Sequence, residues 1–207
     1  PEPGANLENL ENLIDTDPYL TTTSDLVALM VLEHQSQMHN LMTRAVYEAR
    51  RAAHQDQIMG RLLDRPADYV SDSAKRRIAS AGDKLLEYML FTDEFDLTSP
   101  VVGTSSFVKD FEERGIQDDS GRSLRQFDLK TRLFKYPCSF LIHSESYAAI
   151  PQSVRDHVEN RLARILVGQD DSDEFDHLSD QDRRAIGEIL SDTLSGFSER
   201  LDKAGNL

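Results

Sequence analysis

The chain has 207 residues, of which 39% are hydrophobic, so it can bury a sizeable core without disulfide or metal staples. Its 37 acidic and 23 basic residues give a formal net charge of −14, which opposes attraction to nucleic-acid phosphates and to anionic lipid. Nucleic acid and a membrane surface are therefore poor candidate partners.

Helical periodicity dominates the chain, and no segment alternates apolar and polar residues as a half-buried strand would. The sequence predicts an all-α fold, an irregular multi-helix bundle. We expect a linker-like N-terminal segment over residues 1–17, a single helical domain over 18–197 and a frayed C-terminal tail over 198–207. The chain starts at Pro1 without an initiator methionine, which favours a processed protein or a piece of a longer one.

The first predicted helix spans residues 24–58, with the hydroxyl side chains of residues 21–24 as its cap. Residues 26–32 are apolar on every side, which is typical of a buried helix. We therefore expect this long first helix to be buried.

Caps and apolar stripes predict further helices at 71–91, 104–114, 123–136, 138–147, 151–168 and 180–194. These signals include Ser71 as a cap, a capping box of Ser179 and Asp182, and a stripe of Val154, Val158 and Leu162. Pro137 should break the helix that begins at Ser123, because proline cannot donate a backbone N–H and forces Tyr136 out of helical geometry. The fold should thus contain a Pro-broken central helix. Residues 92–103 are predicted to be irregular and to lie against the bundle through their apolar side chains, Phe95, Leu97, Val101 and Val102.

Two candidate ligands lie on one face of the first helix. His34 and Met38 are one turn apart, and this pair of residue types can ligate haem iron or copper. The alternative is a core histidine with one hydrogen bond beside a methionine that fills a gap. His39 and Glu33 are further candidate metal ligands, but His39 lies about 140° around the helix from His34, so the two histidines cannot chelate one ion without a break in the helix.

A polar row runs beside this stripe and includes Gln37, Asn40 and Arg44. These side chains form either a buried polar network that floors a ligand pocket or a solvated edge of the helix. The Glu-x-x-His pairs of a ferritin-type dimetal site are absent from the sequence.

Cys138 is the only cysteine, which excludes an internal disulfide and a Cys-pair zinc or haem-attachment motif in this segment. Its aromatic and aliphatic neighbours favour a buried, structural thiol over a reactive one. The acidic stretch 170–176 lacks the glycine and the final glutamate of a calcium loop, so we expect a solvated turn there. No apolar run is long enough, at about 18 residues, to span a membrane.

Several stretches together resemble a known family, namely residues 19–21, 24–35, 38–40, 121–125, 127–139, 177–179 and 182–186. They are similar to the C-terminal region of large exported proteins from planctomycete-like and related environmental bacteria, some of which are described as cytochrome-c-like. The resemblance implies a periplasmic or secreted setting, with any haem-attachment cysteines upstream of this segment. It assigns no catalytic residue.

Two hypotheses for function follow. In the first, the chain is a non-catalytic helical accessory or interaction module of a larger exported bacterial protein, and its partner is the remainder of that polypeptide or another periplasmic protein. This hypothesis places no cofactor in the segment. In the second, the chain contributes ligands or a polar pocket to a periplasmic haem or metal redox site.

Overall fold

The structure is a computed structural model that describes residues 9–19, 22–66 and 68–206. Within these residues it is all-helical and has no sheet, which confirms the predicted fold class. Residues 1–8 of the expected linker and Thr21 of the expected cap lie outside the described residues. The elements are α1 Leu26–Leu62, α2 Asp72–Met89, α3 Phe107–Glu113, η1 Phe140–His143, α4 Glu145–Ala148, α5 Gln152–Leu166, η2 Asp173–Phe175, α6 Asp180–Thr193 and α7 Phe197–Gly205.

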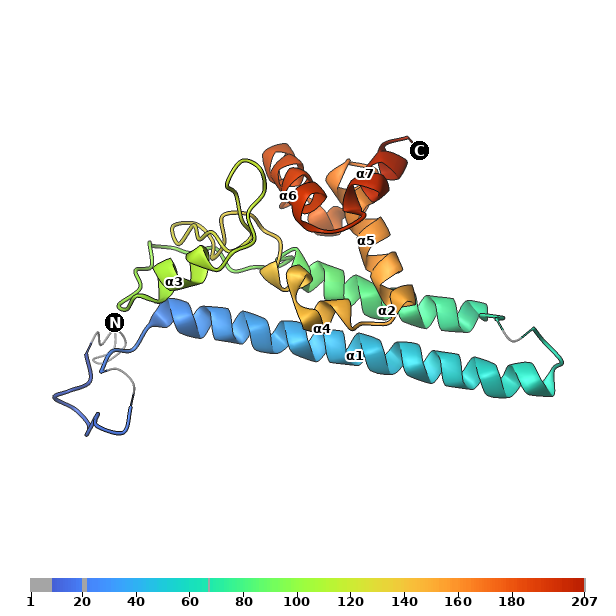
Figure 1. Cartoon of the computed structure of the whole chain (residues 1–207), viewed down its shortest axis with the longest axis horizontal. Coiled ribbons are helices and arrows are strands. Elements are labelled where there is room, and N and C mark those ends of the chain that lie inside the picture. The colour runs from blue at the N-terminus through green and yellow to red at the C-terminus, as the bar shows by residue number, and fades with distance from the viewer. Residues whose placement is uncertain (1–8, 20–21, 67, 207) are drawn as a thin grey trace.

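The helices stack outward from one long helical hairpin. α1 and α2 lie side by side and antiparallel, and α5 packs across α2 (Figure 1). α6 and α7 pack on α5 and lie away from α1, at the opposite side of the molecule (Figure 1). α1 therefore has neighbours along one side only. No helix among the described residues has both the length and the apolar character needed to cross a membrane.

α1 is amphipathic in the structure, so the expectation that its opening turns are buried all round is wrong. Asp25 caps the helix by accepting a hydrogen bond from the Ala28 backbone N–H at 3.1 Å. Val27 and Val31 are buried. The outward side chains of Leu26, Leu29 and Leu32 are 46%, 60% and 57% exposed. An all-apolar sequence cannot bury its outer face when no element packs there.

The expected Pro-broken central helix is also wrong, because residues 123–139 form an irregular turn instead. Phe127 and Phe134 form an isolated antiparallel bridge. Between them, the Asp128 carboxylate accepts hydrogen bonds from the Thr131 backbone and hydroxyl and from the Arg132 backbone. Such side-chain bonds offer the backbone an alternative to the helical ladder. The apolar residues of the predicted helix still contact the core: Leu124, Leu133 and Phe134 are buried, and Phe127 and Leu129 pack against them in part.

The connection over 92–103 meets the expectation only in part. The backbone N–H groups of Leu97 and Val101 donate to the carbonyls of Thr131 and Leu129 at 2.9 and 2.8 Å, so the segment lies against the central turn. Phe95 and Val102, in contrast, are exposed. Val101 and Val102 are consecutive, and consecutive residues of an extended segment point to opposite sides, which leaves Val102 outside.

The C-terminal end is ordered helix, and the expected frayed tail is wrong. Ser179 and Asp182 form a capping box at the start of α6, as the sequence predicts. Gly196 then takes a left-handed conformation, with φ of 77°, and lets the chain turn into α7. Phe197 and Ala204 of α7 are buried against the core, which ties down the last helix.

Candidate functional site

His34 is a buried group inside a cluster of aromatic rings. Its side chain is 4% exposed, and its Nε2 lies 2.7 Å from Ser139 Oγ. We call this group the His34 cluster: the imidazole stacks on Phe91 at 4.7 Å and Tyr88 at 5.4 Å, and lies near Phe134 and Phe140 at 5.9 and 6.1 Å between ring centres. The geometry matches a core histidine with one hydrogen bond.

Two features fix the state and position of the imidazole. Burial lowers the pKa of His34 to about 4, so the ring is neutral at pH 7. Phe91, the second residue after α2, takes a left-handed conformation with φ of 59°, which is costly for a bulky side chain. That conformation places the Phe91 ring against His34, so packing in the cluster offsets the backbone strain.

Of the other predicted site residues, Met38 shares the buried face of α1 with His34 and the rest do not. Met38 is fully buried on the same face of α1. Glu33, His39 and the polar row of Gln37, Asn40 and Arg44 are exposed, so that row is a solvated edge and not the floor of a pocket. Among the described residues, no three His, Cys, Asp or Glu side chains are placed to hold a metal ion. A haem or metal at His34 and Met38 stays a prediction that Soret absorbance or elemental analysis of the purified chain would test.

Cys138 is a free, fully buried thiol, as the sequence predicts. Burial raises its pKa to about 12, so the nucleophilic thiolate is scarcely populated at neutral pH. The residue lies in the same hydrophobic core as Phe134 and Phe140. It acts as a small apolar side chain.

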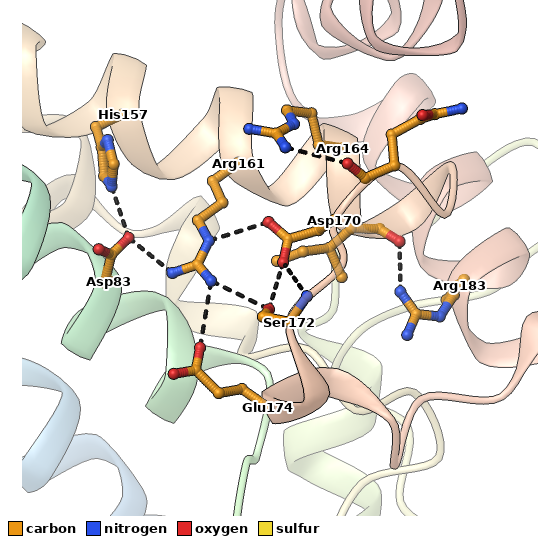
Figure 2. Close-up of polar contacts among 10 residues, drawn as sticks. Asp83, His157, Arg161, Arg164, Asp170, Ser172, Glu174 and Arg183 are labelled. Carbon is orange, nitrogen blue, oxygen red and sulfur yellow. Dashed lines mark hydrogen bonds and ion pairs between the residues drawn. The ribbon is translucent and has the colours of Figure 1, made fainter.

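A second polar centre, which we call the Arg161 cluster, joins three parts of the chain (Figure 2). Arg161 of α5 forms ion pairs with Asp83 of α2 at 2.9 Å and with Asp170 and Glu174 at 3.2 Å. His157, one turn earlier, is 2.7 Å from the same Asp83 oxygen. The Ser172 hydroxyl bonds to both Arg161 and Asp170. Figure 2 shows the guanidinium between α2 and the acidic loop.

The expectation of a solvated acidic turn at 170–176 holds for the exposed side chains of Asp171, Asp173, Glu174 and Asp176. Asp170 departs from it, because its carboxylate is largely buried and paired with Arg161. Although burial opposes the charge of Arg161, its hydrogen bonds to Asp170 and Asp83 raise its pKa above the ordinary range. Burial also opposes ionisation of Asp170, yet hydrogen bonds from Ser172 and Arg161 lower the pKa of its carboxyl. Asp83, Asp170 and Glu174 share the one guanidinium, which makes the cluster a structural tie between α2, α5 and the loop. The carboxylates come from positions far apart in sequence, so no local pattern signals it.

Exposed apolar side chains gather where α1 begins. Thr104 and Ser105 hydrogen-bond to Ser24 and Asp25, which brings the nearby Val102, 78% exposed, to this end of the molecule. The start of α1 lies beside α3, toward the end of the molecule where the described part of the N-terminal segment also lies (Figure 1). We call the exposed group the apolar end and define it as Leu26, Leu29, Leu32 and Val102.

Comparisons with protein-family models, with curated proteins and with solved structures find no match to this chain. The assignment of function therefore rests on the sites themselves.

Proposed function

We propose that this chain is a helical accessory module that binds an apolar segment of a larger exported bacterial protein through its apolar end. The observation that carries the proposal is the outward exposure of Leu26, Leu29 and Leu32 in the first two turns of α1, away from the face that holds Val27 and Val31. Exposed apolar residues that are contiguous, and not scattered singly, mark interaction surfaces. Spacing at every third residue presents them as one ridge along α1.

Charge favours a partner that differs from this chain. Each copy carries a formal charge of −14, so two copies repel one another. Asp25 and Glu33 flank the ridge and add negative charge at its border. An amphipathic segment with leucine-like side chains and flanking lysine or arginine complements both the apolar ridge and its acidic border.

A synthetic amphipathic peptide with a leucine face and lysine flanks tests this proposal. We expect saturable binding in fluorescence anisotropy, and at least a tenfold loss of affinity in the double variant Leu29→Gln, Leu32→Gln. That variant keeps the charge, so a change cannot come from general electrostatic attraction. Both side chains are exposed, and the free energy of unfolding should stay within about 0.5 kcal/mol of the wild type for each substitution.

Tyr47→Gln is the matched control, because Tyr47 is also an exposed side chain of α1 but lies well beyond the apolar end. It should bind the peptide as the wild type does. Equal binding by the double variant and the wild type would contradict the proposal. Sedimentation that shows dimers of the wild type, lost in the double variant, would replace the proposed partner by a second copy of the chain.

A further inference from the structure

A small pocket at the end of α3 is lined by two arginines, Arg114 and Arg125. It has a volume of about 150 Å³ and lies between the end of α3, the segment at 123–125 and the residues from η1 to the start of α4. Arg114, Arg125, His143 and Ser144 give it a polar wall, and Phe140 and Leu141 are among its apolar walls. Its size suits a small ion or a single functional group.

Arg125 is held in this pocket without a counter-charge. Its Cζ atom lies 4.7 Å from the centre of the Phe111 ring and 4.9 Å from that of Phe140. The rings fix the half-buried guanidinium by cation–π contact, but they carry no net negative charge. Among the described residues, no carboxylate or other acceptor pairs with the N–H groups of its guanidinium.

Arg114 adds a second positive charge at the edge of the same pocket. It is the C-cap residue of α3, and its exposed side chain likewise has no ionic partner among the described residues. Burial, and then the nearby charge of Arg114, lower the pKa of Arg125. Two guanidinium groups that repel each other without a shared anion are unfavourable, and an anion between them removes the repulsion.

The pairing of arginines elsewhere makes this pocket distinct. Arg122 meets two carboxylates at 2.7 Å, Arg161 meets three, and Arg200 meets two, at 2.7 and 3.0 Å. The half-buried Arg183 donates to three backbone carbonyls and Arg155 donates to the Gln152 side chain, so these guanidinium groups have acceptors too. Among the described residues, Arg125 is the half-buried arginine whose guanidinium has no acceptor, although the chain has a large excess of carboxylates.

His143 completes the wall as a fixed neutral group. Its Nε2 lies 2.9 Å from Thr193 Oγ1, and the Thr193 hydroxyl donates to the Ile189 carbonyl at 2.6 Å. Burial and the charge of Arg125 lower the pKa of His143 to about 4. The ring is therefore uncharged at pH 7 and held in place by α6, so the positive charge of the pocket comes from the two arginines.

We propose that this pocket is an oxyanion site, in which Arg125 and Arg114 bind a phosphate or carboxylate group through their free N–H donors. The planar guanidinium matches the oxygen spacing of both groups and can donate two parallel hydrogen bonds. Aromatic contacts hold Arg125 in position before the anion arrives, which reduces the ordering cost of binding. This site is separate from the apolar end, and its test is independent of the proposed partner.

Isothermal titration calorimetry of the full chain at low ionic strength, with inorganic phosphate and with acetate as the two probes, tests the site. We expect close to one equivalent of at least one probe to bind the wild type, and the better probe tells a phosphate source from a carboxylate source. Arg125→Met keeps much of the packing between the rings but removes the charge. It should weaken binding by about tenfold or more.

Arg114→Gln, at an exposed position, should weaken binding in the same way without affecting folding, which circular dichroism would verify. Arg76→Gln is the matched control, since Arg76 is exposed on α2 and does not line the pocket. It should bind both probes as the wild type does. The absence of saturable binding by either probe, or equal affinities in the wild type and in both pocket variants, would overturn the proposal.

Discussion

The His34 cluster and the Arg161 cluster connect distant parts of the chain by different physical means. The first joins α1 to the end of α2 and to the central turn through stacked rings and one histidine held neutral. The second joins α2 to α5 and the acidic loop through paired charges that remain partly exposed. The stability that the His34 cluster contributes depends on close packing and on its buried groups staying neutral. The stability that the Arg161 cluster contributes depends on attraction between opposite charges, which salt screens.

The largest expected effect comes from placing a charge in the apolar region. Cys138→Asp should lower the free energy of unfolding by more than about 4 kcal/mol, because the buried carboxylate would have no partner. Urea denaturation followed by circular dichroism measures it, with Cys138→Ala as the volume control and a much smaller loss expected there. Rapid labelling of native wild-type Cys138 by a thiol reagent would contradict its burial.

Removing the central charge of the ionic region should cost somewhat less. Arg161→Met should lower the free energy of unfolding by about 2–4 kcal/mol, because Asp83, Asp170 and Glu174 lose their shared cation while remaining close together. Arg164→Met is the matched control on the same helix, since Arg164 is exposed and its side chain, among the described residues, donates only to the Gln169 carbonyl. A loss no larger than that of the control would show that the cluster does not tie α2 to the loop.

Acid should weaken the His34 cluster within a defined pH range. The pKa of His34 is about 4 in the folded chain and about 6.5 in the unfolded one, so between these values the unfolded chain binds the extra proton. The stability that His34 contributes is complete above pH 6.5 and is lost as pH falls toward 4. From pH 7 to pH 5 the loss attributable to this residue should be about 2 kcal/mol.

His34→Gln isolates that contribution. The variant itself should be less stable at pH 7 by roughly 1–3 kcal/mol, because it leaves a buried polar group mispaired with Ser139. Its stability should then fall less than that of the wild type between pH 7 and pH 5. Parallel pH curves for the two proteins would contradict a neutral, buried His34.

Salt should produce the smallest effect and separate the two regions most clearly. Raising sodium chloride to 1 M screens partly exposed ion pairs, so the stability difference between the wild type and Arg161→Met should shrink by about 1 kcal/mol or less. The difference between the wild type and His34→Gln should not change. Denaturation curves at the two salt concentrations measure both differences, and equal salt responses would remove the proposed distinction between the regions.

The regular helices could be predicted from sequence because their signals are local. Ser71, Ser179 and Asp182 act as the caps that their positions predict, and Val154, Val158 and Leu162 form the buried stripe of α5. The burial of Cys138 also follows from its neighbours in sequence. These features depend on hydrogen bonds and contacts between residues that are close in sequence, so a short stretch of sequence is enough to predict them.

Only the tertiary structure determines which apolar residues are buried and which polar residues form hydrogen bonds or ion pairs. Leu29 and Val31 belong to one apolar run, but Leu29 is exposed and Val31 is buried, because elements pack on one side of α1. Residues 123–136 have the apolar spacing of a helix, but the Asp128 carboxylate bonds to the backbone N–H groups of Thr131 and Arg132 and the segment forms a turn. Asp83, Arg161 and Asp170 come together only when α2, α5 and the loop are assembled, and Arg125 is left without such a partner. Local sequence sets the periodicity of a segment, while burial and charge pairing depend on contacts between segments that are distant along the chain.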